Sequence, residues 1–172
     1  MISEAIKLQQ KIKVNRTQAS NIDTITGALG EFSFAEWFLG DWKKHEVGNN
    51  SGQVDFDDCI EIKTSTFPFR ESLNLLVRQD YAIKRQPAFY IQVIIDSNAR
   101  SLSEITPGTS AIIAGFATGH QVEHAPLKDF GSKFGGKGGY KCHFIEISKL
   151  HRMTEFQDQY QQYKLNSKKH SP

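Results

Sequence analysis

The sequence predicts an α/β fold in which a mixed β-sheet lies in the middle of three layers and is flanked by helices. Apolar residues recur at helical spacing as far as Gly40, and beyond it they alternate with polar residues in short runs. The composition of 172 residues, 38% hydrophobic and 23% charged with twelve Phe, is that of a folded protein. This length fits one domain with a substantial core.

Two helices are predicted at the start of the chain. Ser3 can cap a first helix that runs to about Arg16. Asp23 or Thr24 can cap a second, through "TITGALGEFSFAEWFL", which ends at Gly40.

A run of strands follows these helices. Gly, Asn, Asp and Pro separate four short alternating segments, "KKHEVG", "QVDF", "CIEIKTS" and "LNLLVR", which predict a meander. "QDYAIKRQ" predicts a helix of about two turns. The near-continuous apolar run "AFYIQVIID" predicts a strand in the middle of the sheet, covered on both faces.

Two further strands and a helix complete the predicted domain. "SAIIAGFAT" and "KCHFIEI" predict strands, and a glycine-rich loop lies between them. A last helix is predicted from Ser148 to about Leu165. We therefore expect one domain over residues 1–165 and a disordered polar tail over 166–172.

Bulk properties exclude some classes of protein. The net charge of +2 is only permissive for nucleic-acid binding. No apolar run approaches the roughly 18 residues of a membrane span, and the N-terminus lacks the apolar segment of a signal peptide. We expect a cytoplasmic protein without a membrane partner. Cys59 and Cys142 lie in strand-like runs, which predicts buried free thiols.

The stretch "GQVDFDDCIEIKTS" contains the strongest candidate site. On a strand, Glu61 and Lys63 share one face while the isoleucines beside them point to the other. Asp55 joins that face if the hairpin loop has an odd count, for example 57–59, and turns away if the loop is the two residues 57–58.

This arrangement of acids and lysine favours a metal site. Two facing carboxylates repel unless a cation lies between them, and Mg²⁺ takes oxygen ligands from one or two carboxylates. The ion polarises a phosphoryl oxygen, while a nearby lysine holds or deprotonates the attacking water and neutralises developing charge. The combination indicates phosphodiester hydrolysis.

The stretch "VDFDDCIEIKTS" resembles the D…ExK signature of the PD-(D/E)xK nuclease superfamily, with Val54 in the position of the proline. In "GALGEFSFAEWFLG", Glu31 stands in the G-x-x-G-E setting seen in the preceding helix of such proteins. Glycines near Glu31, Gly27 and Gly30, would let that helix approach the sheet closely. The resemblance implies a restriction endonuclease-like αβββαβ core with an extra N-terminal helix.

The resemblance also implies residue roles. Asp55 and Glu61 would bind Mg²⁺, for which Mn²⁺ would substitute, together with the backbone carbonyl of Ile62. Glu31 would reach the metal directly or through water, and Lys63 would position the water or stabilise the transition state. The expected activity is that of a restriction-type endodeoxyribonuclease acting on DNA as a homodimer.

Three alternatives stay open at this point. One is a structure-specific nuclease for Holliday junctions or repair, and another is a non-catalytic DNA-binding domain with the same fold. The third is a structural protein in which the ExK segment is a plain edge strand with its charges in solvent.

Basic residues outside the motif are candidates for binding nucleic acid. They are Lys133, Lys137, Lys141, Arg70 and Arg78. An ordinary solvated surface would account for them equally well. The glycine-rich loop "GSKFGGKG" lacks the Ser or Thr of a nucleotide-binding loop, so no nucleotide cofactor is expected.

The segment "HQVEH" matches an inverted zincin pattern, which requires both histidines on one face of a helix. Gly119 before it and Pro126 after it indicate a strand or turn, so we expect no zinc site there.

Overall fold

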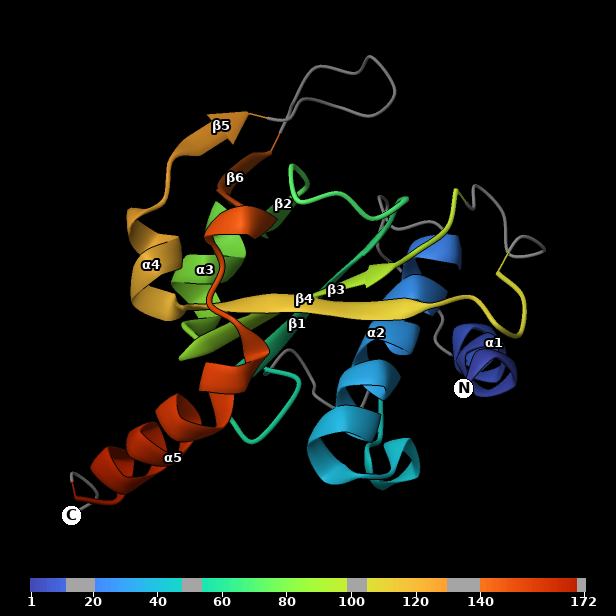
Figure 1. The fold of residues 1–172 in the computed structure, drawn as a ribbon, viewed down its shortest axis with the longest axis horizontal. Coiled ribbons are helices and arrows are strands. Elements are labelled where there is room, and N and C mark those ends of the chain that lie inside the picture. The colour runs from blue at the N-terminus through green and yellow to red at the C-terminus, as the bar shows by residue number, and fades with distance from the viewer. Residues whose placement is uncertain (12–20, 48–53, 99–104, 130–139, 170–172) are drawn as a thin grey trace.

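The computed structural model describes residues 1–11, 21–47, 54–98, 105–129 and 140–169 (Figure 1). The described α-helices are α1 (Ile2–Lys11), α2 (Asn21–Leu39), α3 (Gln79–Arg85), α4 (Gly119–His124) and α5 (Met153–Lys169). The described strands are β1 (Ile60–Thr66), β2 (Asn74–Arg78), β3 (Phe89–Ile95), β4 (Ala111–Thr118), β5 (Leu127–Asp129) and β6 (Lys141–Glu146). The predicted α/β class is therefore confirmed.

The described strands form two sheets of three strands each. In the first, β3 lies between β1, to which it is parallel, and β4, to which it is antiparallel. The second is antiparallel, with β6 between β2 and β5. All seven residues of β3 are buried, as predicted for a central strand. The expected meander is interrupted because β2 pairs with β6.

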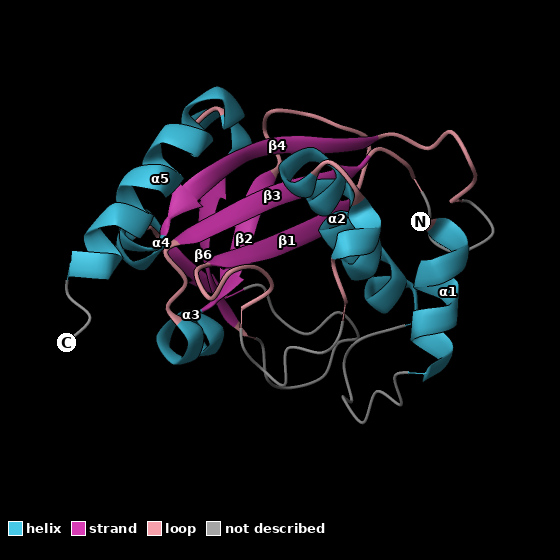
Figure 2. Cartoon of the chain, turned by 90° about the horizontal axis from the view of Figure 1, so that it is seen from below, coloured by secondary structure: helices cyan, strands magenta, loops and turns pink. Residues whose placement is uncertain are grey.

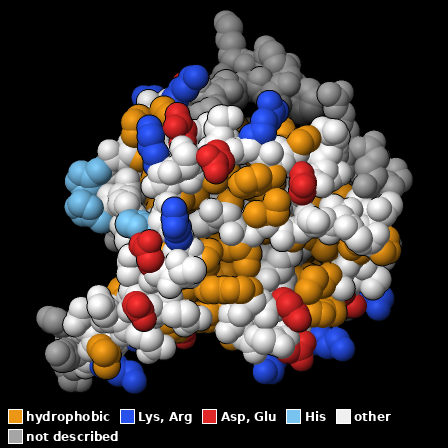
Figure 3. Space-filling view, viewed as in Figure 1, with side chains coloured by type: hydrophobic (Ala, Val, Ile, Leu, Met, Phe, Trp, Pro, Cys, Tyr) orange, Lys and Arg blue, Asp and Glu red, His pale blue; other side chains and the backbone are white. Residues whose placement is uncertain are grey.

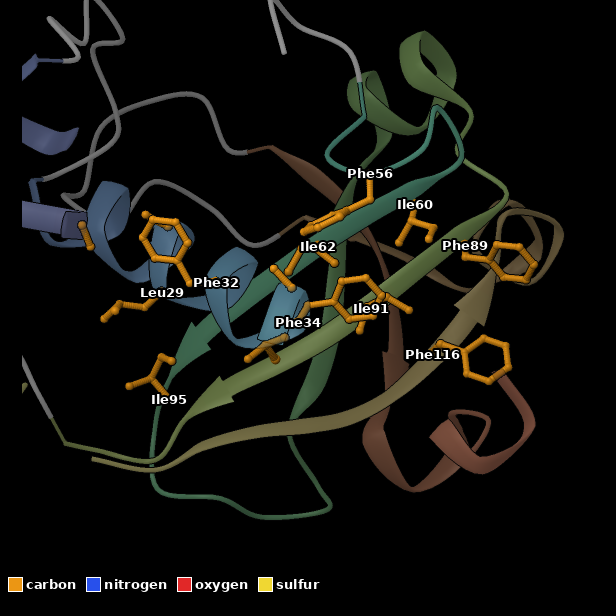
Figure 4. Close-up of a cluster of buried hydrophobic side chains, with 14 of the residues drawn as sticks. Leu29, Phe32, Phe34, Phe56, Ile60, Ile62, Phe89, Ile91, Ile95 and Phe116 are labelled. Carbon is orange, nitrogen blue, oxygen red and sulfur yellow. The ribbon is translucent and has the colours of Figure 1, made fainter. Parts of the chain in front are cut away.

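The two faces of sheet β1-β3-β4 carry separate cores. On one, which we call the α2 face, α1, α2 and α5 cover the isoleucines of β1 and β3 (Figures 2 and 4). On the other, the α3 face, Tyr90 and Ala117 pack with a smaller apolar cluster from β2, α3 and α4. Each face of the sheet is therefore covered by its own apolar cluster.

Aromatic side chains join α5 to α2 on the α2 face. Phe34 of α2 is fully buried and its ring lies edge-on to Phe156 of α5, with 6.0 Å between ring centroids. Phe38 lies in a similar way against Tyr160, at 5.3 Å. Figure 3 shows apolar side chains gathered between these two helices at the surface. These aromatic side chains thus form part of the core on the α2 face.

α2 approaches β1 closely at one glycine. A Cβ atom at Gly30 would collide with the side chain of Thr64 on β1, whereas one at Gly27 would meet nothing within 4 Å. The expectation of close approach is therefore confirmed for Gly30 and is wrong for Gly27. Gly40 ends α2 with a left-handed φ of 72°, which a glycine adopts without strain.

Several element boundaries differ from the predictions. α1 ends at Lys11 among the described residues, so the predicted extension to Arg16 lies outside them. The described part of "KKHEVG", residues 43–47, contains no strand: Trp42–Lys44 is a 3-10 helix, because the Asp41 side chain accepts a hydrogen bond from Lys43 N. Among the described residues of "QVDF", 54–56, only Phe56 pairs, through a single bridge to Ile60.

The last helix begins later and ends later than predicted. His151 forms a backbone bridge to Phe116 of β4, which holds it extended and delays α5 to Met153. The helix continues to Lys169, so the expectation of a disordered tail is wrong for residues 166–169, and 170–172 lie outside the described chain. The hydroxyl of Ser167 donates to the Tyr163 carbonyl inside this added turn. Within the described chain, no helix is both long and apolar enough to cross a membrane.

Candidate active site

A tight hairpin brings Asp55 to β1. Phe56 and Ile60 exchange two backbone hydrogen bonds around the loop Asp57–Asp58–Cys59. Both aspartates of this loop have left-handed φ, 49° and 57°, a region that Asp tolerates better than most residues. The loop count is odd, so Asp55 lies opposite Glu61, the first of the two alternatives.

The carboxylate of Glu61 is buried among cations. Oε1 accepts hydrogen bonds from Lys63 Nζ at 2.6 Å and from Arg85 Nη1 at 2.8 Å. The residue is only 3% exposed, and its Oε2 is buried without a hydrogen-bond partner among the described residues. The alternative of an edge strand with its charges in solvent is therefore wrong for Glu61.

Asp55 lies where negative charges meet. Its Oδ2 accepts a hydrogen bond from the backbone N–H of Ile62 at 2.8 Å. Burial raises the pKa of Asp55 from 3.8 to about 7, and the charges of Glu31 and then Glu61 add to the rise. The Ile62 hydrogen bond and the charge of Lys63 oppose it. The site therefore holds more negative charge than its own cations balance at this position.

Glu31 reaches the same region from α2. Its Oε2 lies 2.8 Å from His45 Nε2, and the His45 ring stacks on Phe56 of the hairpin with 3.8 Å between centroids. The Glu31 side chain is 15% exposed. His45 thus links α2 to the hairpin that carries Asp55.

The oxygen atoms present fit a small hard cation only in part. Asp55 and Glu61 offer two carboxylates, one with an unpartnered buried oxygen, which matches the one or two carboxylates that Mg²⁺ takes. Yet within the described residues no three His, Cys, Asp or Glu side chains are grouped to hold a metal ion. The site would thus need water or substrate oxygens as further ligands, and a direct metal contact from Glu31 is not part of this geometry.

α5 holds the tip of the hairpin. Lys164 Nζ lies 2.8 Å from Asp57 Oδ2, and the Tyr160 hydroxyl donates to the same oxygen. Burial pushes the pKa of Asp57 upward, but the hydrogen bonds from Lys164 and Tyr160 outweigh it and lower the pKa. The C-terminal helix therefore fixes the turn two residues after Asp55.

Sequence reasoning missed two residues that the structure brings to Glu61 and Lys63. Arg85 lies in the predicted two-turn helix "QDYAIKRQ", and a helix placed after a strand gives no signal of which of its side chains returns to the sheet. Gln92 is the register partner of Lys63 on β3 and is 1% exposed, and its Oε1 lacks a hydrogen bond from any described group. A lone polar residue in the apolar run "AFYIQVIID" was the available signal for Gln92.

The predicted nucleic-acid contacts are only partly placed. Lys133 and Lys137 lie outside the described residues. Arg70 and Lys141 are exposed, and Arg78 is partly exposed. Arg78 donates two hydrogen bonds to Asp80, at 3.0 and 2.6 Å, so its charge is partly balanced.

The segment "HQVEH" is helical, and the expectation of a strand or turn is wrong. Thr118 caps α4 through a capping box with Gln121, a signature that "TGHQ" contains. His120 and His124 therefore share one helix face, with their rings stacked at 4.2 Å, and histidine is visible at the surface over α4 (Figure 3). Among the described residues, neither histidine belongs to a group of three side chains that could hold a metal ion. Cys59 and Cys142 are buried free thiols, as predicted.

Comparisons with known proteins identify no relative. No family model, no curated protein and no solved structure matches this chain. Inferences about function therefore depend on the residues and their geometry.

Proposed function

We propose that this chain is a Mg²⁺-dependent endodeoxyribonuclease that hydrolyses phosphodiester bonds of DNA, most simply one of restriction type. The observation that carries the proposal is the buried Glu61 carboxylate. One of its oxygens is bound by Lys63 and Arg85, while the other is buried without a hydrogen bond from the described residues. Asp55 lies opposite Glu61 on the hairpin, and the charge of Glu61 adds to the rise in the pKa of Asp55. Such a buried, polar and charged cluster costs stability, which proteins accept mainly at functional sites.

The order of elements supports the same proposal. α2, the Asp55 hairpin, β1, β2, α3 and β3 follow one another as in an αβββαβ core, with α1 as the added N-terminal helix. We propose that the restriction endonuclease-like arrangement extends over this part of one domain.

Each residue would have a distinct part in the reaction. A divalent cation held by Asp55 and Glu61 would supply a polarised phosphoryl oxygen and a more acidic water. Lys63 can orient that water or neutralise charge that develops on the phosphate, because its ammonium group already lies 2.6 Å from Glu61 Oε1. Without a cation, Asp55 is ionised only above about pH 7. A bound cation would lower the pKa of Asp55, so cation binding and ionisation of Asp55 favour each other.

Cleavage of plasmid DNA and of a four-way junction, with Mg²⁺, with Mn²⁺ or with chelator, tests the proposal. We expect metal-dependent cutting that falls by at least about 100-fold in Lys63→Ala. That variant keeps the Arg85 contact to Glu61, and Lys7→Ala, an exposed lysine of α1, is its matched control.

The substrate and the quaternary structure distinguish the alternatives. Preference for the junction would favour a structure-specific nuclease over the restriction type. DNA binding without cutting of either substrate would contradict the catalytic proposal and favour a non-catalytic binding domain. Two copies would be needed to cut both strands with one site per chain, so we also propose a homodimer, which sedimentation of the protein with duplex DNA tests.

A further inference from the structure

A continuous row of cations and aromatic rings leads away from Glu61 on the α3 face. The Arg85 guanidinium group, which binds Glu61, lies over the Tyr81 ring, 5.2 Å from its centroid. The Arg78 guanidinium group lies over the same ring at 4.7 Å and over the Tyr140 ring at 5.4 Å. We call these four residues the arginine strip.

The strip is continuous with the candidate active site. β2 and β6 pair with Arg78 opposite Cys142, and exposed Lys141 is the next residue of β6. Arg85 joins the strip to the site directly, because its guanidinium group binds Glu61 Oε1 and lies over the Tyr81 ring.

The chemistry of the strip suits phosphate oxygens better than bases. Both guanidinium groups lie over the Tyr81 ring, so its ring surface is already used by cations. Stacked guanidinium groups keep N–H donors at their edges, and these match phosphate oxygens in a forked geometry.

Besides Glu61, which binds Arg85, a second acid competes for the cations of the strip. Asp80, whose side chain is 59% exposed, accepts two hydrogen bonds from Arg78. This pairing lowers the pKa of Asp80 and balances part of the Arg78 charge. A phosphate that approaches Arg78 must displace or share this partner.

We propose that the arginine strip binds the phosphate backbone of a DNA strand next to the scissile bond, and that Asp80 weakens this binding by competing for Arg78. This inference rests on the proposed nuclease function, since it takes Glu61 as part of the reacting site. Arg85 is then both a partner of Glu61 and the first backbone contact, and Arg78 is the second.

Binding of a labelled 30-base-pair DNA in chelator, measured over a range of salt concentrations, tests the strip. Arg78→Ala should weaken binding about three- to tenfold and reduce the slope of log K against log salt by about 0.9. Asp80→Asn should act in the opposite direction, with about two- to fivefold tighter binding and a steeper slope. If the Arg78–Asp80 ion pair had only a structural role, the two substitutions would change the affinity for DNA in the same direction.

An ion pair elsewhere in the molecule supplies matched controls. Lys7 and Glu4 pair at 3.4 Å on α1, which Figure 1 shows far from α3. Lys7→Ala and Glu4→Gln change the net charge as Arg78→Ala and Asp80→Asn do, and we expect less than about a 1.5-fold effect on affinity. Equal effects at both pairs would overturn the strip and indicate a response to net charge alone.

The two proposals fail in different ways. If Arg78→Ala and Asp80→Asn bind like the unchanged protein while Mg²⁺-dependent cutting still requires Lys63, the strip is wrong and the nuclease stands. If the unchanged protein binds no DNA in chelator, the strip is also wrong. If the variants shift as expected but nothing is cut with Mg²⁺ or Mn²⁺, the strip stands as a DNA contact and the nuclease proposal is overturned.

Discussion

The α2 face and the α3 face of sheet β1-β3-β4 bury different chemistry on the same strands. On the α2 face, Ile60, Ile62 and Ile91 pack against α2 in an apolar core (Figure 4). One residue further along each strand, Glu61 and Gln92 are equally buried on the α3 face, and each has an oxygen without a hydrogen bond from the described residues.

This difference separates stability from chemistry. Apolar burial on the α2 face contributes stability in proportion to the area removed from water, roughly 25 cal/mol per Å². Buried polar atoms without partners cost free energy instead, about 1–3 kcal/mol each. The strands therefore use one face to hold the fold and the other to hold groups that are prepared to meet a ligand.

The largest expected effect is on the α2 face. Phe34→Ala removes a fully buried ring that contacts Phe38, Phe56 and Phe156, and should lower the free energy of unfolding by about 3–5 kcal/mol. Denaturant titration measures it. Ile83→Ala, at a side chain that is 68% exposed, should change stability by less than about 0.5 kcal/mol. Equal losses would show that the α2 face is not the main core.

On the α3 side of the comparison, removal of a charge should stabilise the protein. The folded protein keeps a proton on Asp55 up to about pH 7, whereas the unfolded chain releases it near 3.8, so stability falls as pH rises between these values. Asp55→Asn removes this loss, on the order of 1.4 kcal/mol for each unit of pKa shift. Without metal, the melting temperature of Asp55→Asn should exceed that of the unchanged protein at pH 8 and match it at pH 4. A lower melting temperature at pH 8 would contradict the account.

Gln92 allows a smaller test of the same idea. The buried Gln92 amide has an oxygen without a hydrogen-bond partner among the described residues. Gln92→Met puts an apolar side chain of similar length in its place and should raise the free energy of unfolding by about 1 kcal/mol. Gln157→Met, at an exposed position of α5, should leave it nearly unchanged. A clear loss of stability in Gln92→Met would mean that the hydrogen bonds from Gln92 Nε2 to Val93 O and Ser65 Oγ contribute more than the unpartnered oxygen costs.

The smallest expected effect concerns the hairpin. Lys164→Ala removes a cation from Asp57 at an exposed site, so the free energy of unfolding should change by less than about 1 kcal/mol. If α5 positions Asp55, nuclease turnover should still fall a few-fold while KM for DNA stays the same. Lys168→Ala, one turn further on, is the control. A change in KM alone would instead place Lys164 in DNA binding.

Local pattern was enough for much of the fold. Alternation in "CIEIKTS" and the apolar run at β3 predicted both strands, and helical spacing with a terminal Gly40 predicted α2. Where the predictions were wrong, a side chain or a distant strand decided the outcome. The Thr118 capping box made "HQVEH" helical, and the bridge between His151 and Phe116 delayed α5.

The candidate site divides in the same way. Glu61 and Lys63 could be placed on one face from strand geometry, and Asp55 followed once the loop count was known. The contacts of Arg85 with Glu61 and of His45 with Glu31 could not be predicted, because each joins residues from different elements and the spacing of residues along the sequence does not reveal it. Such contacts depend on how the helices and strands pack together, which the local sequence does not specify.

Mn²⁺ binding followed by electron paramagnetic resonance tests most directly whether the oxygens of Asp55 and Glu61 are cation ligands. We predict that the unchanged protein binds Mn²⁺, that Asp55→Asn loses most of this binding, and that the Glu4→Gln control keeps it. Failure of the unchanged protein to bind Mn²⁺ from pH 7 to 8.5, or undiminished binding in Asp55→Asn, would contradict the account.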